Sequence, residues 1–363
     1  MTHNSPRIIR IVKSGPMTLV QDRGRFGFQK LGVSVSGAVD IDSFDLGNLL
    51  VGNDRDTACL EVLLGGLEIE FSGDSVIAVT GAESDVTIDG VPISLGVSYY
   101  VHSDARLELG RATVGLRTYI AVSGGIDIPQ TLGSRSTHIA SKIGGVDGRS
   151  LVAGDELNLG EPGDLVASGL LLEGETTSCP SGEISVRIMI GPQDDEFSDA
   201  GIESLLNSSY VVSDQSNRQG LRLEGPAIES KSRRYDIVSD AVVNGSIQVP
   251  GDGKPIILLA DRQTTGGYAK IATIATVDLP RLGQATPGTN ITFTAITVEE
   301  SQELLAGRSE RFKPHNLVGI VKEVSFKVDG DDIAVGVADN GQSALAAVDG
   351  TIYPIAVEEY TPV

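Results

Sequence analysis

Residues 246–268 read Ser-Ile-Gln-Val-Pro-Gly-Asp-Gly-Lys-Pro-Ile-Ile-Leu-Leu-Ala-Asp-Arg-Gln-Thr-Thr-Gly-Gly-Tyr, the most informative stretch of the chain. Its two short apolar runs are bounded by polar, glycine-rich turns, a pattern typical of short strands joined by tight connections. The second turn concentrates hydrogen-bonding side chains, which suits a site that matches a small polar amide or urea group by group. A solvated hairpin end with turn glycines explains the same composition, so the stretch alone leaves both interpretations open.

The pattern of short apolar runs separated by glycine-rich turns extends over the whole 363 residues. Hydrophobic residues make up 40% and charged residues 21%, which is enough for a packed core and argues against global disorder. Tryptophan is absent and aromatic residues reach only 4%, so the core has to be built from Val, Ile, Leu and Ala. The 44 glycines favour many tight turns over long helices.

The net charge and the cysteine content indicate the cellular compartment and the classes of partner. The formal net charge of −21 repels nucleic-acid phosphates and anionic lipid, so we expect neither nucleic acid nor membrane as a partner. Residues 1–6 lack the apolar run of a signal peptide, and no stretch is long enough to span a bilayer. Cys59 and Cys179 do not make a disulfide framework, which favours a reducing compartment. We therefore expect a cytoplasmic protein.

Eight segments have the β-branched content and the glycine-rich boundaries of strands: 7–12, 67–71, 75–80, 97–101, 116–122, 184–190, 255–260 and 290–296. Helix signals are few. Segments 42–51 and 195–206 are amphipathic, and Thr297 with Glu300 forms a capping box before Leu304 and Leu305. These patterns predict a mainly β chain with a few short helices.

A turn at 161–164 and a polar stretch at 173–182 place the most plausible seam between residues 159 and 182. The sequence pattern changes again after about residue 307. We expect an N-terminal β-barrel domain over 1–182, a second one over 183–307, and a β tail over 308–363.

Several common chemistries are not supported. Gly251-Asp252-Gly253-Lys254 resembles part of a phosphate loop, but Pro255 stands where Ser or Thr is required. There is no G-x-S-x-G nucleophile elbow, and the four histidines have no metal-ligand spacing, so we expect no metal site. Any catalysis would rest on carboxylates, arginines, amides and hydroxyls.

Three polar blocks remain, at 20–53, 123–137 and 213–225, the last leading into the opening stretch. In the first, Arg25 can offer a planar pair of donors to a carbonyl or carboxylate, and Asp40 either caps the following helix or acts as an acid. In the second, Arg135 is surrounded by hydroxyls and glycines, as in an anion or carbonyl cradle; a glycine-stabilised loop with a surface arginine is the alternative.

Together these blocks resemble the biotin-dependent carboxyltransferase-like family, over about residues 8–300. The most specific pieces are 20–27, 36–38, 133–137, Arg218 with Gly220, and 248–250 through 263–268. Gly47 departs from the alanine that the family usually has before Asn48. The family includes the C subunit of bacterial 5-oxoprolinase, the second of the allophanate-hydrolase-type subunits, and the carboxyltransferase region of urea carboxylase.

The resemblance implies two cyclophilin-like β-barrel domains and a related partner, the B subunit, which resembles allophanate hydrolase subunit 1. It implies a third subunit, the A subunit, where the assembly opens the lactam of 5-oxoproline to L-glutamate with ATP. It also implies an alternative, in which a carboxyl group moves from carboxybiotin to urea or a related amide, so biotin is a possible cofactor. A further alternative is a non-catalytic binding protein that antagonises a kinase-inhibitor partner.

Lactams, urea and the biotin ureido ring are all resonance-stabilised amides, and attack on them, or by them, builds charge on the carbonyl oxygen. Preorganised donors aimed at that oxygen lower the barrier, and a carboxylate has to manage protons on nitrogen. The expected catalytic residues are Asp261, then Asp40, with Arg25 and Arg135. The expected substrate-binding residues are Gln21, Ser134, Arg218, Gln248, Gln263, Thr264, Thr265 and Lys270.

Overall fold

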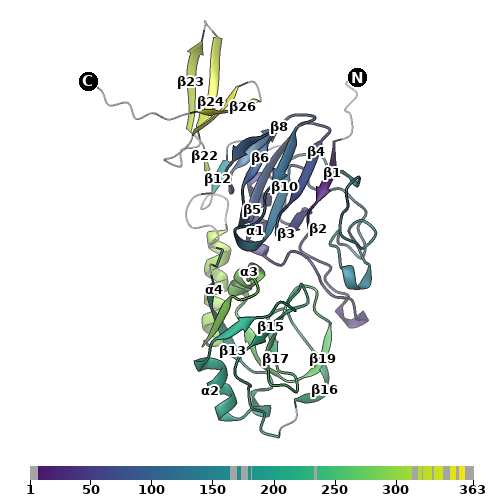
Figure 1. Cartoon of the computed structure of the whole chain (residues 1–363), viewed down its shortest axis with the longest axis vertical. Coiled ribbons are helices and arrows are strands. Elements are labelled where there is room, and N and C mark those ends of the chain that lie inside the picture. The colour runs from purple at the N-terminus through teal and green to yellow at the C-terminus, as the bar shows by residue number, and fades with distance from the viewer. Residues whose placement is uncertain are drawn as a thin grey trace, which may run out of the picture.

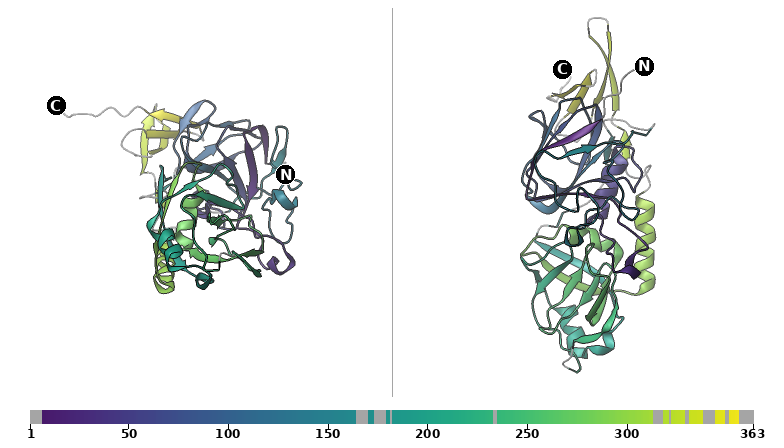
Figure 2. Two further views of the ribbon diagram at one scale, coloured as in Figure 1. Left: turned by 60° about the horizontal axis from the view of Figure 1, so that its bottom comes forward. Right: turned by 90° about the vertical axis from the view of Figure 1, so that its right-hand side faces the viewer.

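The computed structural model describes residues 7–163, 170–172, 179–180, 182–232, 235–312, 318–320, 322–328, 331–337, 344–348 and 351–355. Two β-rich bodies lie one above the other, with a long helix beside the junction (Figures 1 and 2). Within the described ranges, no helix has the length and apolar character needed to cross a bilayer. The prediction of a mainly β chain with few helices is confirmed.

The N-terminal body consists of two antiparallel sheets that enclose one core of Val, Ile and Leu. The six-stranded sheet runs in the order β11 (Glu156–Asn158), β1 (Ile8–Ser14), β4 (Leu67–Phe71), β9 (Arg106–Leu109), β6 (Val86–Ile88), β7 (Val91–Ile93). The five-stranded sheet runs β2 (Met17–Gln21), β3 (Cys59–Leu63), β10 (Val114–Val122), β5 (Ser75–Glu83), β8 (Ser98–Val101).

The expected N-terminal β-barrel domain is thus built from two sheets, and the closed ring in the described residues is in the second body. The chain passes from one sheet to the other at Gly15, whose φ of +65° is in the left-handed region. A Cβ at Gly15 would collide with the carbonyl of Gly65, so this corner depends on glycine. The corner separates β1 from β2 and directs them into different sheets.

The second body is a closed barrel of seven strands around its own core. The order around the ring is β13 (Glu183–Ile190), β20 (Lys270–Ile274), β17 (Ser246–Gln248), β18 (Ile256–Leu258), β15 (Gly220–Glu224), β14 (Tyr210–Val212), β21 (Asn290–Ala295). The ring closes through parallel pairing of β13 with β21, from Glu183 opposite Asn290 to Ile188 opposite Ala295. The hairpin-like pair β16 (Asp236–Ala241) and β19 (Thr265–Tyr268) lies outside the ring.

Four α-helices are present in the described ranges: α1 (Ile41–Leu50), α2 (Asp199–Asn207), α3 (Leu279–Gly283) and α4 (Val298–Arg311). Short 3-10 turns are η1 (Gln29–Leu31), η2 (Ile139–Ser141), η3 (Asp194–Glu196) and η4 (Thr276–Asp278). The capping box at Thr297 and Glu300 is present at the start of α4. Arg308 near the end of α4 donates to Asp42 at 2.7 Å, which ties the helix to the N-terminal body.

Beyond the barrel, β12 (Leu170–Leu172) pairs with β22 (Val318–Ile320). Two antiparallel pairs follow, β23 (Lys322–Val328) with β24 (Asp331–Val337), and β25 (Ala344–Val348) with β26 (Thr351–Ile355). The expected seam at 159–182 falls partly outside the described residues. The domain boundaries at 182 and 307 therefore stay predictions.

Candidate functional site

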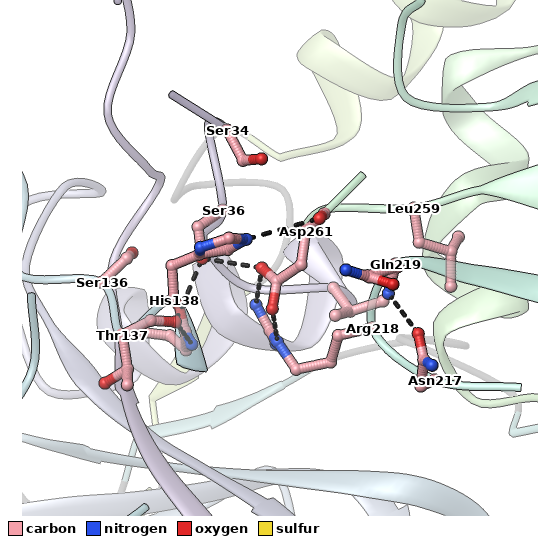
Figure 3. A network of polar contacts seen from close by, with 12 residues as sticks. Ser34, Ser36, Ser136, Thr137, His138, Asn217, Arg218, Gln219, Leu259 and Asp261 are labelled. Atoms are coloured by element: carbon pink, nitrogen blue, oxygen red, sulfur yellow. Dashed lines mark hydrogen bonds and ion pairs between the residues drawn. The ribbon is translucent and has the colours of Figure 1, made fainter. Parts of the chain in front are cut away.

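Buried charges meet where the barrel contacts the N-terminal body (Figure 3). Arg218, in the turn just before β15, donates from Nε to Asp261 Oδ2 at 2.9 Å and from Nη2 to Asp261 Oδ1 at 3.0 Å. Its Nη1 reaches Glu61 on β3, and its Nη2 also reaches the carbonyl of Gly37 at 2.6 Å. Burial opposes the charge on Arg218, but the two carboxylates prevail and raise its pKa. One guanidinium thus joins both bodies.

Glu61 extends this network into the N-terminal sheet. Its Oε2 accepts from the Tyr119 hydroxyl at 2.7 Å and from the amide of Val39 at 3.1 Å, and Arg117 Nε lies 3.6 Å from Oε1. Burial above all raises the pKa of Tyr119 well above its usual value and lowers that of Arg117. Sequence patterns alone did not point to Glu61 or Tyr119. The available signal was a lone acid in the otherwise apolar segment 59–63.

Asp40 caps α1, the first of the two roles considered for it. Its Oδ1 accepts from the Ser43 amide at 3.1 Å, and its Oδ2 accepts from the Ser43 hydroxyl and from Gln284 Nε2, each at 2.6 Å. Gln284 belongs to the barrel side and also accepts the amides of Leu116 and Arg117 at 2.9 Å. Complete burial raises the pKa of Asp40 to about 6. Asp40 is therefore both a helix cap and a link between the bodies.

Asp22 organises the second polar block. Its Oδ1 accepts from Ser134 Oγ at 2.7 Å and from Ser136 Oγ at 2.5 Å, and its Oδ2 accepts from the amide of Arg135 at 2.5 Å. The Arg135 side chain turns away from this cradle and donates to Asp127 Oδ1 at 2.6 Å. Ser134 thus positions the loop, and the guanidinium of Arg135 does not join the network of Asp261.

Arg25 is a buried guanidinium with unused donors. Its side chain is 1% exposed, and Nη2 donates to the carbonyl of Ser136. Nε and Nη1 are buried without a hydrogen-bond partner. Burial lowers the pKa of Arg25, while Asp22 and Asp261 act in the opposite direction. Two buried N–H groups with nothing to bind are suited to an oxygen of a ligand.

Gln21 presents a matching acceptor nearby in the chain. Its Nε2 donates to the carbonyl of Thr137 at 3.0 Å, but its buried Oε1 has no partner. Ser36 Oγ lies 3.1 Å from the same carbonyl and 2.7 Å from Asp261 Oδ1, either of which can accept its proton. His138 Nδ1 accepts from the amide of Ser141, so its Nε2 is the donor toward the carbonyl of Asp261 at 3.4 Å. These contacts bring Gln21, Arg25 and Asp261 to one loop region.

The remaining expected substrate-binding residues form a different group on the barrel. Gln263 Nε2 donates to Gln248 Oε1 at 3.2 Å, and Gln248 in turn donates to the carbonyl of Tyr268. Lys270 is buried and paired with Asp240 at 2.6 Å, which leaves it little freedom to hold a substrate carboxylate. Of the two threonines of this stretch, Thr264 is half-buried and Thr265 is exposed on β19.

A cleft of about 840 Å³ opens at the junction, on the side of Arg117 and Arg218. Its other walls come from the start of β10 and from the barrel loops around Asn217 and Thr286. The volume is in the range of small-molecule sites. Of the buried network, Arg117 and Arg218 line this cleft, and Arg218 connects it to Asp261.

Metal and thiol chemistry find little support in the described residues. They contain no cluster of three or more His, Cys, Asp or Glu side chains that could hold a metal ion. Burial raises the pKa of Cys59 well above its usual value and that of Cys179 to about 12, so both are protonated thiols at neutral pH.

The two implied cofactors differ in fit. The turn 251–254 does not fit a nucleotide phosphate, because Lys254 is paired with Glu224 in an exposed position. The unused N–H groups of Arg25 fit a carbonyl or carboxylate oxygen, which the biotin ureido ring, its carboxylated form and a lactam all carry. The site therefore suits the oxygen of a planar amide.

Comparison with known proteins identifies the family of this chain. Residues 31–295 match the family described as carboxyltransferase domain, subdomain A and B. The C subunit of 5-oxoprolinase from Escherichia coli (strain K12) is 38% identical over 298 residues, 81% of this chain and 93% of the relative. Its counterpart from Haemophilus influenzae (strain ATCC 51907 / DSM 11121 / KW20 / Rd) is 36% identical over 286 residues, 78% of this chain and 90% of the relative.

Among solved structures, the K. lactis urea amidolyase superposes with a TM-score of 0.77 at 27% identity, over 96% of this chain. The chain spans only 23% of that longer protein. The resemblance drawn from the polar blocks is confirmed, since the family match includes the segments that carry Arg218 and Asp261. The chain belongs to the family defined by the carboxyltransferase domain, subdomains A and B.

Proposed function

We propose that this chain is the C subunit of a 5-oxoprolinase, which opens the 5-oxoproline lactam to L-glutamate with ATP and partner subunits. The observation that carries the proposal is the match to two proteins named as the C subunit of 5-oxoprolinase over 93% and 90% of their own lengths. The geometry supports it, because the site gathers donors for a carbonyl oxygen beside a buried carboxylate.

Arg25 is assigned to the lactam oxygen. Its Nε and Nη1 are held in place by the bond from Nη2 to Ser136, so no reorganisation is needed when charge develops on that oxygen. A preorganised donor of this kind contributes about 3 kcal/mol to the barrier. The free Oε1 of Gln21 can accept the lactam N–H.

Asp261 is assigned to proton transfer at the amide nitrogen. A carboxylate accepts about four hydrogen bonds, and the bonds from Arg218 and Ser36 occupy three of those positions. One position is left for a substrate proton. Asp40 has a pKa of about 6, which also suits a proton carrier, but its contacts with Ser43 and Gln284 favour a positioning role.

ATP would activate the amide within the assembled complex, and the roles assigned to the residues of this chain do not involve ATP directly. The loop that carries Arg25 also displays Phe26 and Leu31, each 68% exposed. Large exposed side chains beside a site are suited to be covered by another protein of the assembly. This supports the partnership with the related B subunit, and with the A subunit.

The test is coexpression with the candidate partner subunits, followed by glutamate release from 5-oxoproline with ATP. Arg25→Met should lower the turnover about 100-fold or more, because it removes a donor to the developing oxyanion. Arg222→Met, which removes an exposed guanidinium of the barrel, is the matched control and should change turnover less than about twofold. Turnover that persists without this chain, or with Arg25→Met, would contradict the proposal.

A second candidate function is carboxyl transfer from carboxybiotin to urea or a related amide. The superposition on the K. lactis urea amidolyase over 96% of this chain favours it. The ureido oxygen of biotin would then contact Arg25. This function predicts that a carboxybiotin carrier is consumed only when the correct amide is added. If the chain acts only as a binding protein, a tight complex would form while Asp261→Ala changes no turnover.

A further inference from the structure

Four of the eight buried side-chain atoms without a hydrogen-bond partner in the described residues belong to three residues of the site. Arg25 contributes Nε and Nη1, Arg262 contributes Nε, and Gln21 contributes Oε1. Each of these side chains is at least nine-tenths buried. These three residues thus hold three spare donors on two cations and one spare acceptor, while Arg117 Nε, the other unpaired guanidinium atom, lies 3.6 Å from Glu61 Oε1.

Arg25 links the other two residues through two loop segments, 136–137 and 34–36. The Gln21 side chain donates to the carbonyl of Thr137 at 3.0 Å, and the Arg25 side chain donates to the carbonyl of Ser136. On the other side, the Arg25 amide donates to the carbonyl of Val35 at 2.8 Å.

Arg262 reaches the same loop from the barrel. Its carbonyl accepts from Ser34 Oγ at 2.6 Å, directly before Val35, and the neighbouring Ser36 amide donates to the carbonyl of Ala260 at 3.1 Å. Segment 34–36 therefore joins the backbone at Arg25 to the backbone at 260–262 of the barrel.

Arg262 is a buried cation for which the described residues offer no counter-charge. Its side chain is 6% exposed, and its one side-chain hydrogen bond is from Nη1 to the carbonyl of Leu259 at 3.4 Å. The adjacent Asp261 is occupied by Arg218. A single long bond to a neutral oxygen does not offset the burial of a charge.

We infer that Arg262 binds the carboxylate of the substrate, so that the site selects an amide that carries an anionic group. This rests on the proposed function, since it assigns the substrate class of the same site. The spare groups match such a molecule: Arg25 for the lactam oxygen, Gln21 for the lactam N–H and Arg262 for the carboxylate. Urea has no carboxylate, and it would leave Arg262 uncompensated.

Binding and turnover test the inference separately. The first experiment measures binding of 5-oxoproline and of 2-pyrrolidinone, the same ring without its carboxylate, to the full chain in complex with its partner subunits. Arg262→Met should weaken 5-oxoproline binding about 10- to 100-fold, the loss expected for a hydrogen-bonded charge. Binding of 2-pyrrolidinone should change less than about twofold. Arg262→Lys should give an intermediate loss, and Arg222→Met should match the wild type.

Thermal unfolding controls for a structural role. Arg262→Met removes an uncompensated buried charge, so its melting temperature should equal or exceed that of the wild type. Equal loss of both ligands together with a lower melting temperature would overturn the inference and make Arg262 a loop support. Normal glutamate formation with an unchanged KM in Arg262→Met would also overturn it, while the proposed reaction stands. Carboxylate-dependent binding without glutamate formation would sustain it and contradict the proposed reaction.

Discussion

The Arg218→Met substitution is the sharpest test of how the two bodies are joined. Methionine keeps much of the volume but removes the two bonds to Asp261, the bond to Glu61 and the bond to the Gly37 carbonyl. Both carboxylates are nine-tenths or more buried. The variant therefore leaves the Asp261 carboxylate in the interior without its counter-ion, while Glu61 keeps Arg117 at 3.6 Å.

The expected loss in the free energy of unfolding depends on which interactions each carboxylate keeps in the variant. Glu61 retains the Tyr119 hydroxyl, the Val39 amide and the nearby Arg117 guanidinium, whereas Asp261 retains only the bond from Ser36. Breaking a buried ion pair by removing one partner costs about 3–5 kcal/mol. We expect a loss of about 4 kcal/mol in the free energy of unfolding, with Asp261 as its main source. Asp261→Asn in the Arg218→Met background should regain about 1–2 kcal/mol.

Guanidinium chloride unfolding measures these differences, with Arg222→Met as the exposed control. A double-mutant cycle of Arg218→Met with Glu61→Gln should give a coupling energy of about 1–3 kcal/mol, since the two residues share one network. A loss below about 1 kcal/mol for Arg218→Met, or one equal to that of the control, would refute the view that this guanidinium holds the bodies together.

Two further predictions concern burial and space. Because the folded-state pKa of Asp40 is raised to about 6, its stabilising contribution is complete below its unfolded pKa of 3.8 and is lost as pH rises through 6. The stability of Asp40→Asn relative to the wild type should thus improve by up to about 3 kcal/mol between pH 4 and pH 8 in urea unfolding; a pH-independent difference would contradict this. Gly144→Ala would place a Cβ against the Ser136 carbonyl and 2.5 Å from Arg25 Nη2, at a φ of +67°. Gly144→Ala should lower the free energy of unfolding by more than about 2 kcal/mol and should lower the turnover. Gly27→Ala, at φ +92° with no atom within 4 Å of the new Cβ, is the control and should cost about 1 kcal/mol. Equal effects of the two substitutions on stability and turnover would refute the packing argument.

Local features were readable from the sequence. The apolar runs became strands within a few residues of the expected bounds, because β-branched residues between glycine turns have few other options. The capping box at Thr297 and the cap at Asp40 formed as expected, since each depends on residues three positions apart. The resemblance to the family was also carried by short contiguous motifs.

The convergence of the site was less readable. Arg218 and Glu61 are 157 positions apart, and only the pairing of strands in two bodies brings them together. The sequence predicted Arg135 as part of an anion or carbonyl cradle, but its guanidinium donates to Asp127 instead. Arg262 lies in the polar turn that the sequence singled out, but its specific feature, the unpaired buried Nε, depends on tertiary structure. Periodicity reports exposure and element type, whereas such pairings depend on tertiary structure.

The parallel seam between β13 and β21 has a consequence for how the protein is made. The first strand of the ring, β13, cannot pair with β21 until the segment that begins at Asn290 has emerged from the ribosome. Until then β13 offers an unpaired edge to any other nascent chain. Fragments that stop short of β21 should therefore aggregate, and closure of the ring should be among the slow steps of folding, because it joins distant parts of the sequence.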